Sequence, residues 1–298
     1  MLDIFTTRRG AILKLVYGCN HHCNFCHERD NILSLEYTMI TLEDLPRIRA
    51  WLIENQFDYV ILSGGECSFH PHLSEIIAEL QKDFFVVVIS NGTNIDRHNF
   101  QELASNVTFY ISFHGLSETY NTITHSSDFD ALVTKIRTLA KLGRTIILRC
   151  VLNRLNIAES ALILEFVMRE FPANVYLEFV LLEDLKYAHV QETSIPLAEY
   201  LRVVYRTLID TKGERFLFDG GPLCANPVLF KIGNRLADPL TNTMVGLVKK
   251  EKNGKLIFDI KTEISKTNVK SRSQKCHICT QRVACHGFDR EYIISEKV

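Results

Sequence analysis

The strongest constraint on the fold of this chain is a regular alternation of apolar strand-like runs with amphipathic helical segments. The apolar runs are nearly continuous, which is typical of strands buried on both faces of a parallel sheet. They span residues 11–18, 59–64, 84–91, 107–114, 145–153 and 175–182. The helical segments span residues 42–55, 72–82, 97–104, 129–142, 157–170 and 196–211. Six consecutive β–α units predict right-handed crossovers and one parallel sheet.

The number of units and the C-terminal pattern set the expected domain organisation. Six units are fewer than the eight of a closed TIM barrel, so we predict an α/β fold built as a partial (β/α)6 TIM-like barrel. After residue 211 the repeats give way to short strand-like runs at 215–218 and 255–260, and Asn253-Gly254 predicts a hairpin turn. We therefore predict a core domain over residues 1–211 and a small cysteine-rich domain over residues 212–298.

The charge balance and hydropathy argue against several classes of partner. The chain has 34 basic and 35 acidic residues, so no overall charge draws it to nucleic acid or to an anionic membrane. The N-terminus shows no apolar signal segment, and no stretch approaches the apolar length of a membrane span. We expect a cytoplasmic protein without nucleic-acid or membrane partners.

The cysteines indicate metal binding rather than disulfide bonds. The chain has nine of them, an odd total that disfavours a disulfide framework when no secretory signal is present. Six form two groups: Cys19, Cys23 and Cys26 near the start, and Cys276, Cys279 and Cys285 near the end. Clustered thiols in a reducing compartment more often hold a metal centre.

The first group has the spacing C-x3-C-x2-C and directly follows the first predicted strand. In parallel α/β folds the loops that follow strands face the ligand site. Three thiolates suit a cubane iron–sulfur cluster in which one iron keeps no protein ligand. The alternative is a zinc site, for which His21, His22 or His27 would supply a fourth ligand.

This spacing, with the aromatic Phe25 before the third cysteine, resembles the signature of the radical S-adenosylmethionine (SAM) superfamily. The resemblance implies that Cys19, Cys23 and Cys26 hold a [4Fe–4S] cluster whose open iron binds SAM. It further implies that SAM is cleaved reductively to a 5′-deoxyadenosyl radical, which abstracts a hydrogen atom from the substrate.

A second motif, Gly64-Gly65-Glu66, follows the second predicted strand and resembles the G-G-E motif of the superfamily. The resemblance implies that these residues bind the amino group of SAM, because glycines let the backbone approach closely and a carboxylate accepts hydrogen bonds from an ammonium. Cys67 stands where the superfamily often has proline. We expect both Cys67 and Cys150 to be packed, inert thiols.

Polar residues also lie at the ends of the later predicted strands. The resemblance implies that Ser90, Asn91 and Ser112 touch the ribose and methionyl groups of SAM. It also implies that Arg149 binds the carboxylate of the cofactor, since a guanidinium can donate two parallel hydrogen bonds to a carboxylate. The loop over residues 125–129 resembles a short loop of the superfamily and is expected to shape the fold rather than react.

The second group of cysteines has the spacing C-x2-C-x5-C and resembles the SPASM and twitch extensions of the superfamily. With Cys224 it would give four thiolates, the full complement for an auxiliary [4Fe–4S] cluster in a twitch-like domain. Zinc is the alternative metal, and His277 or His286 could replace a cysteine ligand. Cys224 could also remain unbound and leave an iron open to substrate.

The resemblance leaves several classes of function open. The first is a peptide- or protein-modifying maturase that receives electrons from a flavodoxin or ferredoxin. Because only eighteen residues precede Cys19, a separate peptide-recognition protein is an expected partner. The second is a small-molecule radical enzyme, either an aminosugar dehydrogenase or a nucleotide cyclase. The third is an iron–sulfur or zinc protein that binds a partner without catalysis.

Overall fold

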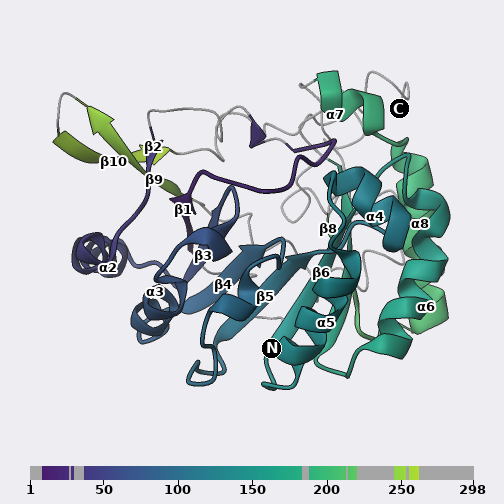
Figure 1. The fold of residues 1–298 in the computed structure, drawn as a ribbon, viewed down its shortest axis with the longest axis horizontal. Helices are drawn as coiled ribbons and strands as arrows, with labels where there is room; N and C mark the ends of the chain where they lie inside the picture. Colours follow the sequence, from purple (N-terminus) through teal and green to yellow (C-terminus); the bar gives the residue numbers. More distant parts are fainter. Residues whose placement is uncertain are drawn as a thin grey trace, which may run out of the picture.

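The computed structural model describes residues 9–26, 28–29, 37–182, 188–212, 214–219, 245–252 and 255–261. Within these ranges, strands and helices alternate along the chain (Figure 1). The four cysteines expected to bind the auxiliary cluster, Cys224, Cys276, Cys279 and Cys285, lie outside the described residues. That ligand set and the division at residue 212 therefore stay predictions.

Seven parallel strands, in the same order as in the chain, form the central part of the ten-stranded sheet in the described residues. They are β1 (Gly10–Val16), β3 (Tyr59–Gly64), β4 (Phe85–Ser90), β5 (Val107–Ser112), β6 (Thr145–Leu152), β7 (Val175–Leu181) and β8 (Phe216–Asp219). The six strands expected from the apolar runs are confirmed, and so is their parallel pairing. The described strands end in two edges that do not pair with each other, so the sheet is an open, partial barrel.

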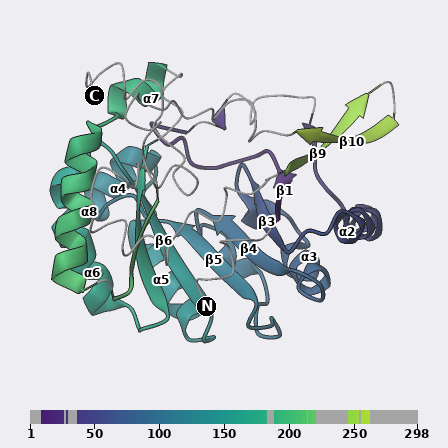
Figure 2. The ribbon, with the colours of Figure 1, turned by 180° about the vertical axis from the view of Figure 1, so that it is seen from behind.

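The helices lie in the connections between the strands (Figures 1 and 2). They are α2 (Leu45–Glu54), α3 (Leu73–Leu80), α4 (Ser117–Thr124), α5 (Phe129–Ala140), α6 (Ser160–Glu170), α7 (Ala188–Thr193) and α8 (Leu197–Thr211). In the described part of the chain they are accompanied by the short 3-10 turns η2 (Leu42–Asp44), η3 (Cys67–Phe69), η4 (Ile95–Arg97) and η5 (Ile157–Glu159). The polar, threonine-rich helix α4, whose buried apolar side chains are those of Tyr120 and Ile123, was not expected.

The helix expected over residues 97–104 is wrong. The structure has only η4 there, and the backbone becomes extended at His98. The side chain of Asn99 then accepts a hydrogen bond from the backbone nitrogen of Gln101 (3.1 Å), a local bond that competes with helix formation. Phe100 and Leu103 are nevertheless buried, which explains the helix-like spacing of apolar residues.

The C-terminal strands add to both edges of the predicted six-stranded sheet. The run that we expected in the small domain forms β8, which pairs in parallel with β7 as a seventh strand. At the other edge, β9 (Val245–Lys252) pairs in parallel with β1 and then runs antiparallel to β10 (Lys255–Lys261). Lys252 lies opposite Lys255, so the antiparallel pairing of the predicted hairpin is confirmed, whereas its turn, residues 253–254, lies outside the described residues. The two-residue β2 (Tyr37–Thr38) also pairs with β9.

The two faces of the sheet differ in what covers them. The outward side chains of β5, Val107, Phe109 and Ile111, are buried in one large core with the helices, whereas Thr108, Tyr110 and Ser112 point to the concave face and stay half-buried. The concave face carries a small apolar cluster that contains no helical residue. Polar chemistry therefore has room at the carboxyl ends of the strands, on the concave side. No described helix is both long and apolar enough to cross a membrane.

Arg215, just before β8, ties this added strand to the core. Its guanidinium donates hydrogen bonds to the backbone oxygens of Val175 (2.9 Å), Phe171 (3.0 Å), Val167 (3.3 Å) and Met168 (3.4 Å). The carbonyls of Val167 and Met168 lie in the last turn of α6, and that of Phe171 lies at its C-cap, where a helix leaves carbonyls short of partners. The Val167 oxygen also accepts a hydrogen bond from the Phe171 nitrogen (3.3 Å). A single side chain thus closes the end of α6 and fixes β8 beside β7.

We predict that Arg215→Ala lowers the free energy of unfolding by about 2–3 kcal/mol, because hydrogen bonds from a charged group to buried carbonyls are lost. Urea denaturation measures this change. Arg206→Ala is the matched control, since the Arg206 side chain on α8 is 82% exposed. Equal denaturation midpoints for the two variants would contradict the tether.

Candidate active site

Three free thiols, Cys19, Cys23 and Cys26, lie on the loop that follows β1. We call residues 17–26 the cysteine loop. All three cysteine residues are half-buried, and none forms a disulfide bond. The backbone nitrogen of Cys26 donates to the oxygen of Cys23 (3.1 Å), which turns the chain between the last two cysteines. The loop leaves β1 at the carboxyl edge of the sheet, where parallel folds place their ligands.

The Gly64-Gly65 pair at the end of β3 lies directly against the start of the cysteine loop. The backbone nitrogen of Gly65 donates to the oxygen of Val16 (2.9 Å), and that of Glu66 donates to the oxygen of Gly18 (2.8 Å). A Cβ atom at residue 65 would lie 2.4 Å from the Gly18 oxygen. At Gly64, which has a φ of +140°, it would lie 2.1 Å from the Val16 oxygen. Both positions therefore require glycine.

The buried carboxylate of Glu66 joins the ends of β3 and β4. Its Oε1 accepts hydrogen bonds from the Ser68 nitrogen (2.8 Å) and the Ser90 hydroxyl (2.6 Å), and its Oε2 accepts one from the Asn91 nitrogen. Since a carboxylate has about four acceptor positions, little capacity remains for a ligand. The Ser90 oxygen also accepts from the Gly92 nitrogen (2.9 Å). Ser90 thus acts on the site through Glu66.

Asn91 is a predicted residue whose side chain reaches a cysteine. Its Nδ2 donates to Oδ1 of Asn20 (3.0 Å) and lies 3.8 Å from Sγ of Cys19. Nδ2 of Asn20 in turn donates to Oγ1 of Thr93 (3.2 Å). Sequence reasoning missed Asn20 and Thr93. For Asn20 the available signal was its position between two cysteines.

The far end of the cysteine loop is tied back to β1. Lys14 is buried on β1, and its Nζ forms an ion pair with Oε1 of Glu28 (2.5 Å). Nη2 of Arg29 donates to the oxygen of Cys23 (3.1 Å). A lysine within an otherwise apolar strand could be noticed in the sequence. Nothing in the sequence identifies Glu28 as its partner.

Burial sets the protonation state of the free thiols. It raises the pKa of Cys19 and of Cys26, and it raises the pKa of Cys23 to about 12 with help from the two neighbouring cysteines. These groups are therefore thiols on their own and become thiolates only against a positive charge such as iron. In the described part of the chain, no three His, Cys, Asp or Glu residues gather as they would around a single metal ion. A cubane does not need that arrangement, because its thiolates bind different irons.

The other two described cysteines are packed in the core, as expected. Cys67 and Cys150 are both fully buried, and burial raises the pKa of each thiol well above its ordinary value. The Cys67 thiol donates to the backbone oxygen of Ile89 (2.9 Å). Neither is set up as a thiolate nucleophile.

Ser112 and Arg149 lie opposite each other in the register of β5 and β6, on the concave face. Nε of Arg149 pairs with Oε2 of Glu178 (2.9 Å), its Nη2 pairs with Asp219, and its guanidinium lies 5.8 Å from the centre of the Tyr110 ring. Arg149 therefore already holds two carboxylates of the protein. Its expected role toward the cofactor carboxylate stays a prediction.

His114, at the carboxyl end of β5, packs against the aromatic residue of the cysteine motif. Its ring meets Phe25 edge to face, with centroids 4.9 Å apart. Its Nδ1 accepts a hydrogen bond from the backbone nitrogen of Val151 (3.3 Å). Burial, with smaller contributions from His21 and Arg149, lowers the pKa of His114 to about 3. His114 is therefore neutral and supports the loop by packing.

The sequence profile of the radical SAM superfamily matches residues 13–167, which is just over half of the chain. The matched segment runs from β1 into α6 and contains the cysteine loop and the Gly64–Glu66 turn. The chain belongs to the radical SAM superfamily, whose members are enzymes. No curated protein matches the chain significantly in sequence.

Solved structures of this superfamily share the fold. Streptococcus suis SuiB, bound to the precursor peptide SuiA, matches with a TM-score of 0.69 and 14% identity over 99% of this chain and 75% of that one. Native anSMEcpe with bound AdoMet matches with a TM-score of 0.64 and 16% identity over 94% and 89%. A radical SAM methyltransferase from Sphaerobacter thermophilus reaches a TM-score of 0.55 and 16% identity over 72% and 67%.

We predict that Gly65→Ala displaces the cysteine loop, because the added Cβ would overlap backbone oxygens, and that it costs about 1–3 kcal/mol of stability. Iron uptake by the reconstituted protein should fall with it. Gly18→Ala is the control, since nothing lies within 4 Å of a Cβ at that position. Full iron uptake by Gly65→Ala would contradict the close packing.

We predict that His114 makes the protein less stable in acid. Its pKa is about 3 in the folded state against an ordinary value of 6.5, so the unfolded state binds the extra proton between these limits. The free energy of unfolding should fall by about 1.4 kcal/mol for each pH unit from 6.5 toward 3 through this residue alone. In urea titrations at several pH values, His114→Gln should show a shallower dependence than the exposed control His72→Gln. Identical slopes would refute the assignment.

Proposed function

We propose that this chain is a radical SAM enzyme in which Cys19, Cys23 and Cys26 hold a [4Fe–4S] cluster. The observation that carries the proposal is the position of the cysteine loop, hydrogen-bonded through Gly65 and Glu66 to the end of β3. The three cysteine residues there are free and half-buried, which suits a cluster with one iron open to SAM.

The residues around the loop fit the second cofactor as well. When bound, the cluster and SAM together supply a 5′-deoxyadenosyl radical that abstracts hydrogen from a substrate. Gly64 and Gly65 bring bare backbone to the site, and Glu66 keeps one acceptor position for the ammonium of SAM. We assign Ser90 to supporting Glu66, Asn91 and Ser112 to the polar groups of SAM, and Arg149 to its carboxylate.

We further propose that the substrate is a peptide or a protein segment. Two of the fold relatives were crystallised with peptides: SuiB with the precursor peptide SuiA, and anSMEcpe with the Cp18Cys peptide. The concave face offers the half-buried side chain of Tyr110 beside the cofactor residue Arg149. A flavodoxin or ferredoxin would supply electrons, and a separate protein could present the peptide.

The auxiliary centre is a further part of the proposal. Cys224, Cys276, Cys279 and Cys285 would hold a second [4Fe–4S] cluster, which suits a maturase with an oxidative outcome because a cluster can accept an electron from a substrate radical. The alternative function is that of a small-molecule radical enzyme, either an aminosugar dehydrogenase or a nucleotide cyclase.

The test is anaerobic reconstitution followed by iron counting and assay of 5′-deoxyadenosine. We predict about eight irons in the wild type, two cubanes of four each, and about four in the triple variant Cys19→Ala/Cys23→Ala/Cys26→Ala. Only the wild type should form 5′-deoxyadenosine. Cys150→Ser, a buried thiol outside the site, should match the wild type in both measurements.

Each part of the proposal fails separately. About four irons in the wild type and none in the triple variant would remove the auxiliary cluster but leave the radical enzyme. Unchanged 5′-deoxyadenosine formation in the triple variant would refute the assignment of the three cysteines. A precursor peptide that gains no mass change under conditions of SAM cleavage would contradict its being the substrate.

A further inference from the structure

The spacer between the first two cysteines, residues 20–22, is held by two separate parts of the fold. Asn20 bonds to the loop after β4 through Asn91 and Thr93. The backbone nitrogen of His22 donates to the oxygen of Thr124 at the C-terminal end of α4 (3.1 Å). Two of the three spacer residues, Asn20 and His22, are therefore hydrogen-bonded to neighbouring elements.

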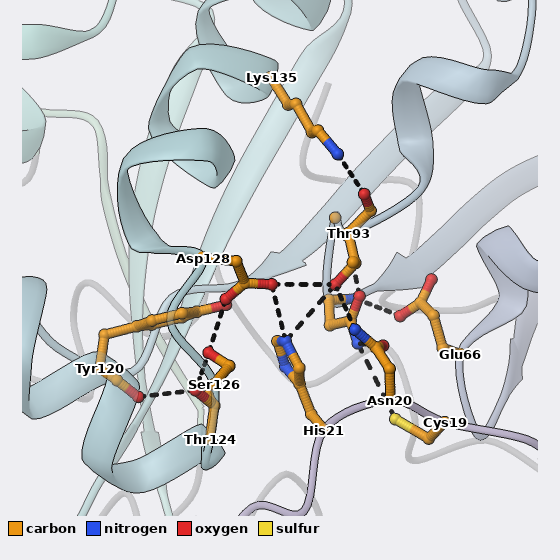
Figure 3. Close-up of polar contacts among 12 residues, drawn as sticks. Cys19, Asn20, His21, Glu66, Thr93, Tyr120, Thr124, Ser126, Asp128 and Lys135 are labelled. Carbon is orange, nitrogen blue, oxygen red and sulfur yellow. Dashed lines mark hydrogen bonds and ion pairs between the residues drawn. The ribbon is translucent and has the colours of Figure 1, made fainter.

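The anchor of His21 is Asp128, at the start of α5. The His21 side chain is only 2% exposed, and its Nε2 lies 3.0 Å from Oδ2 of Asp128 (Figure 3). A carboxylate accepts hydrogen bonds, so Nε2 carries the proton in this pair. The ring also meets Tyr120 of α4 edge to face, with centroids 6.2 Å apart. Both the hydrogen bond and the ring packing fix the direction of the imidazole.

The side chain of Asp128 does not cap helix α5, although Asp128 occupies the N-cap position. Asp128 is the N-cap residue of α5, where aspartate normally accepts a hydrogen bond from the first turn of the helix, yet it makes no such bond. Its Oδ1 accepts from the hydroxyl of Ser126 (2.6 Å) instead, and its Oδ2 accepts from His21 and from the hydroxyl of Thr93 (3.4 Å). The carboxylate faces the cysteine loop and leaves the helix uncapped.

Charge and neighbouring contacts support the same geometry. Burial opposes ionisation of Asp128, but hydrogen bonds from Ser126 and His21 outweigh it and lower the pKa of the carboxyl. Lys135, about two helical turns along α5 from Asp128, donates to the backbone oxygen of Thr93 and pairs with Asp96 (2.9 Å). The loop after β4 is thereby fixed to the same helix that carries Asp128.

We propose that Asp128 is a positioning residue that acts through His21 to hold the spacer, and so sets the separation of Cys19 and Cys23 before the cluster is bound. The inference rests on the proposed function and deepens it. Carboxylates that orient residues next to a metal centre typically change metal affinity by about 10- to 100-fold when they are removed. The sequence marks 125–129 only as a fold-shaping loop; the structure gives its aspartate a specific target.

The experiment compares how fast iron is lost from reconstituted protein to the ferrous chelator bathophenanthroline. The variants are Asp128→Ala, His21→Ala, their double variant, and Asp130→Ala as an exposed control on the first turn of α5. We expect about tenfold faster loss in each single variant. We expect no further increase in the double variant, because both changes remove the same contact. The control should match the wild type.

Two further measurements separate positioning from a general loss of fold. Apo Asp128→Ala should keep the circular dichroism spectrum of the wild type and unfold in a single cooperative transition, because the carboxylate does not cap α5. His21→Gln, which keeps an N–H donor, should recover slow iron loss when Asp128 is present and fail to do so in Asp128→Ala.

Iron loss at the wild-type rate in Asp128→Ala, or effects of the two single variants that multiply in the double variant, would overturn the positioning role alone. If wild-type protein and the triple cysteine variant bound the same amount of iron, the proposed function would fall, and this inference with it. The two failures are therefore distinguishable.

Discussion

The structure of the site depends on the backbone contact between the ends of two neighbouring parallel strands. The turn after β3 donates two hydrogen bonds to the chain as it leaves β1, at Val16 and Gly18. This contact is possible only because Gly64 and Gly65 have no side chain to hold the strands apart. The superfamily motif thus has a structural role in this chain, since it fixes where the cysteine loop begins.

Side-chain hydrogen bonds link the carboxyl ends of further strands to this contact. Glu66 accepts hydrogen bonds from Ser90 and Asn91 at the end of β4, and the Asn91 side chain in turn contacts Cys19 in the cysteine loop. A buried carboxylate would be costly without partners, but three donors satisfy it here. The first cysteine is therefore held between two strand ends that are themselves hydrogen-bonded together.

The sequence predicted the parts of the fold that depend on local patterns. Six buried strands could be predicted because their apolar runs are continuous. The cysteine and glycine motifs could be recognised because their residues lie close together in the sequence. The helix over 97–104 failed because a local bond from Asn99 competes with helix formation. Contacts between distant residues were not readable: nothing in the sequence pairs His21 with Asp128, or Arg149 with both Glu178 and Asp219.

The central claim is that the cysteine loop holds a cluster with one iron free of protein ligands. The most direct measurement is the EPR spectrum of the reduced Cys276→Ala/Cys279→Ala protein with and without SAM, since this variant lacks two of the four cysteines proposed to hold the auxiliary cluster. The account predicts a [4Fe–4S] signal whose g-values shift when SAM is added. A signal that SAM leaves unchanged, or the absence of any cluster signal, would contradict it.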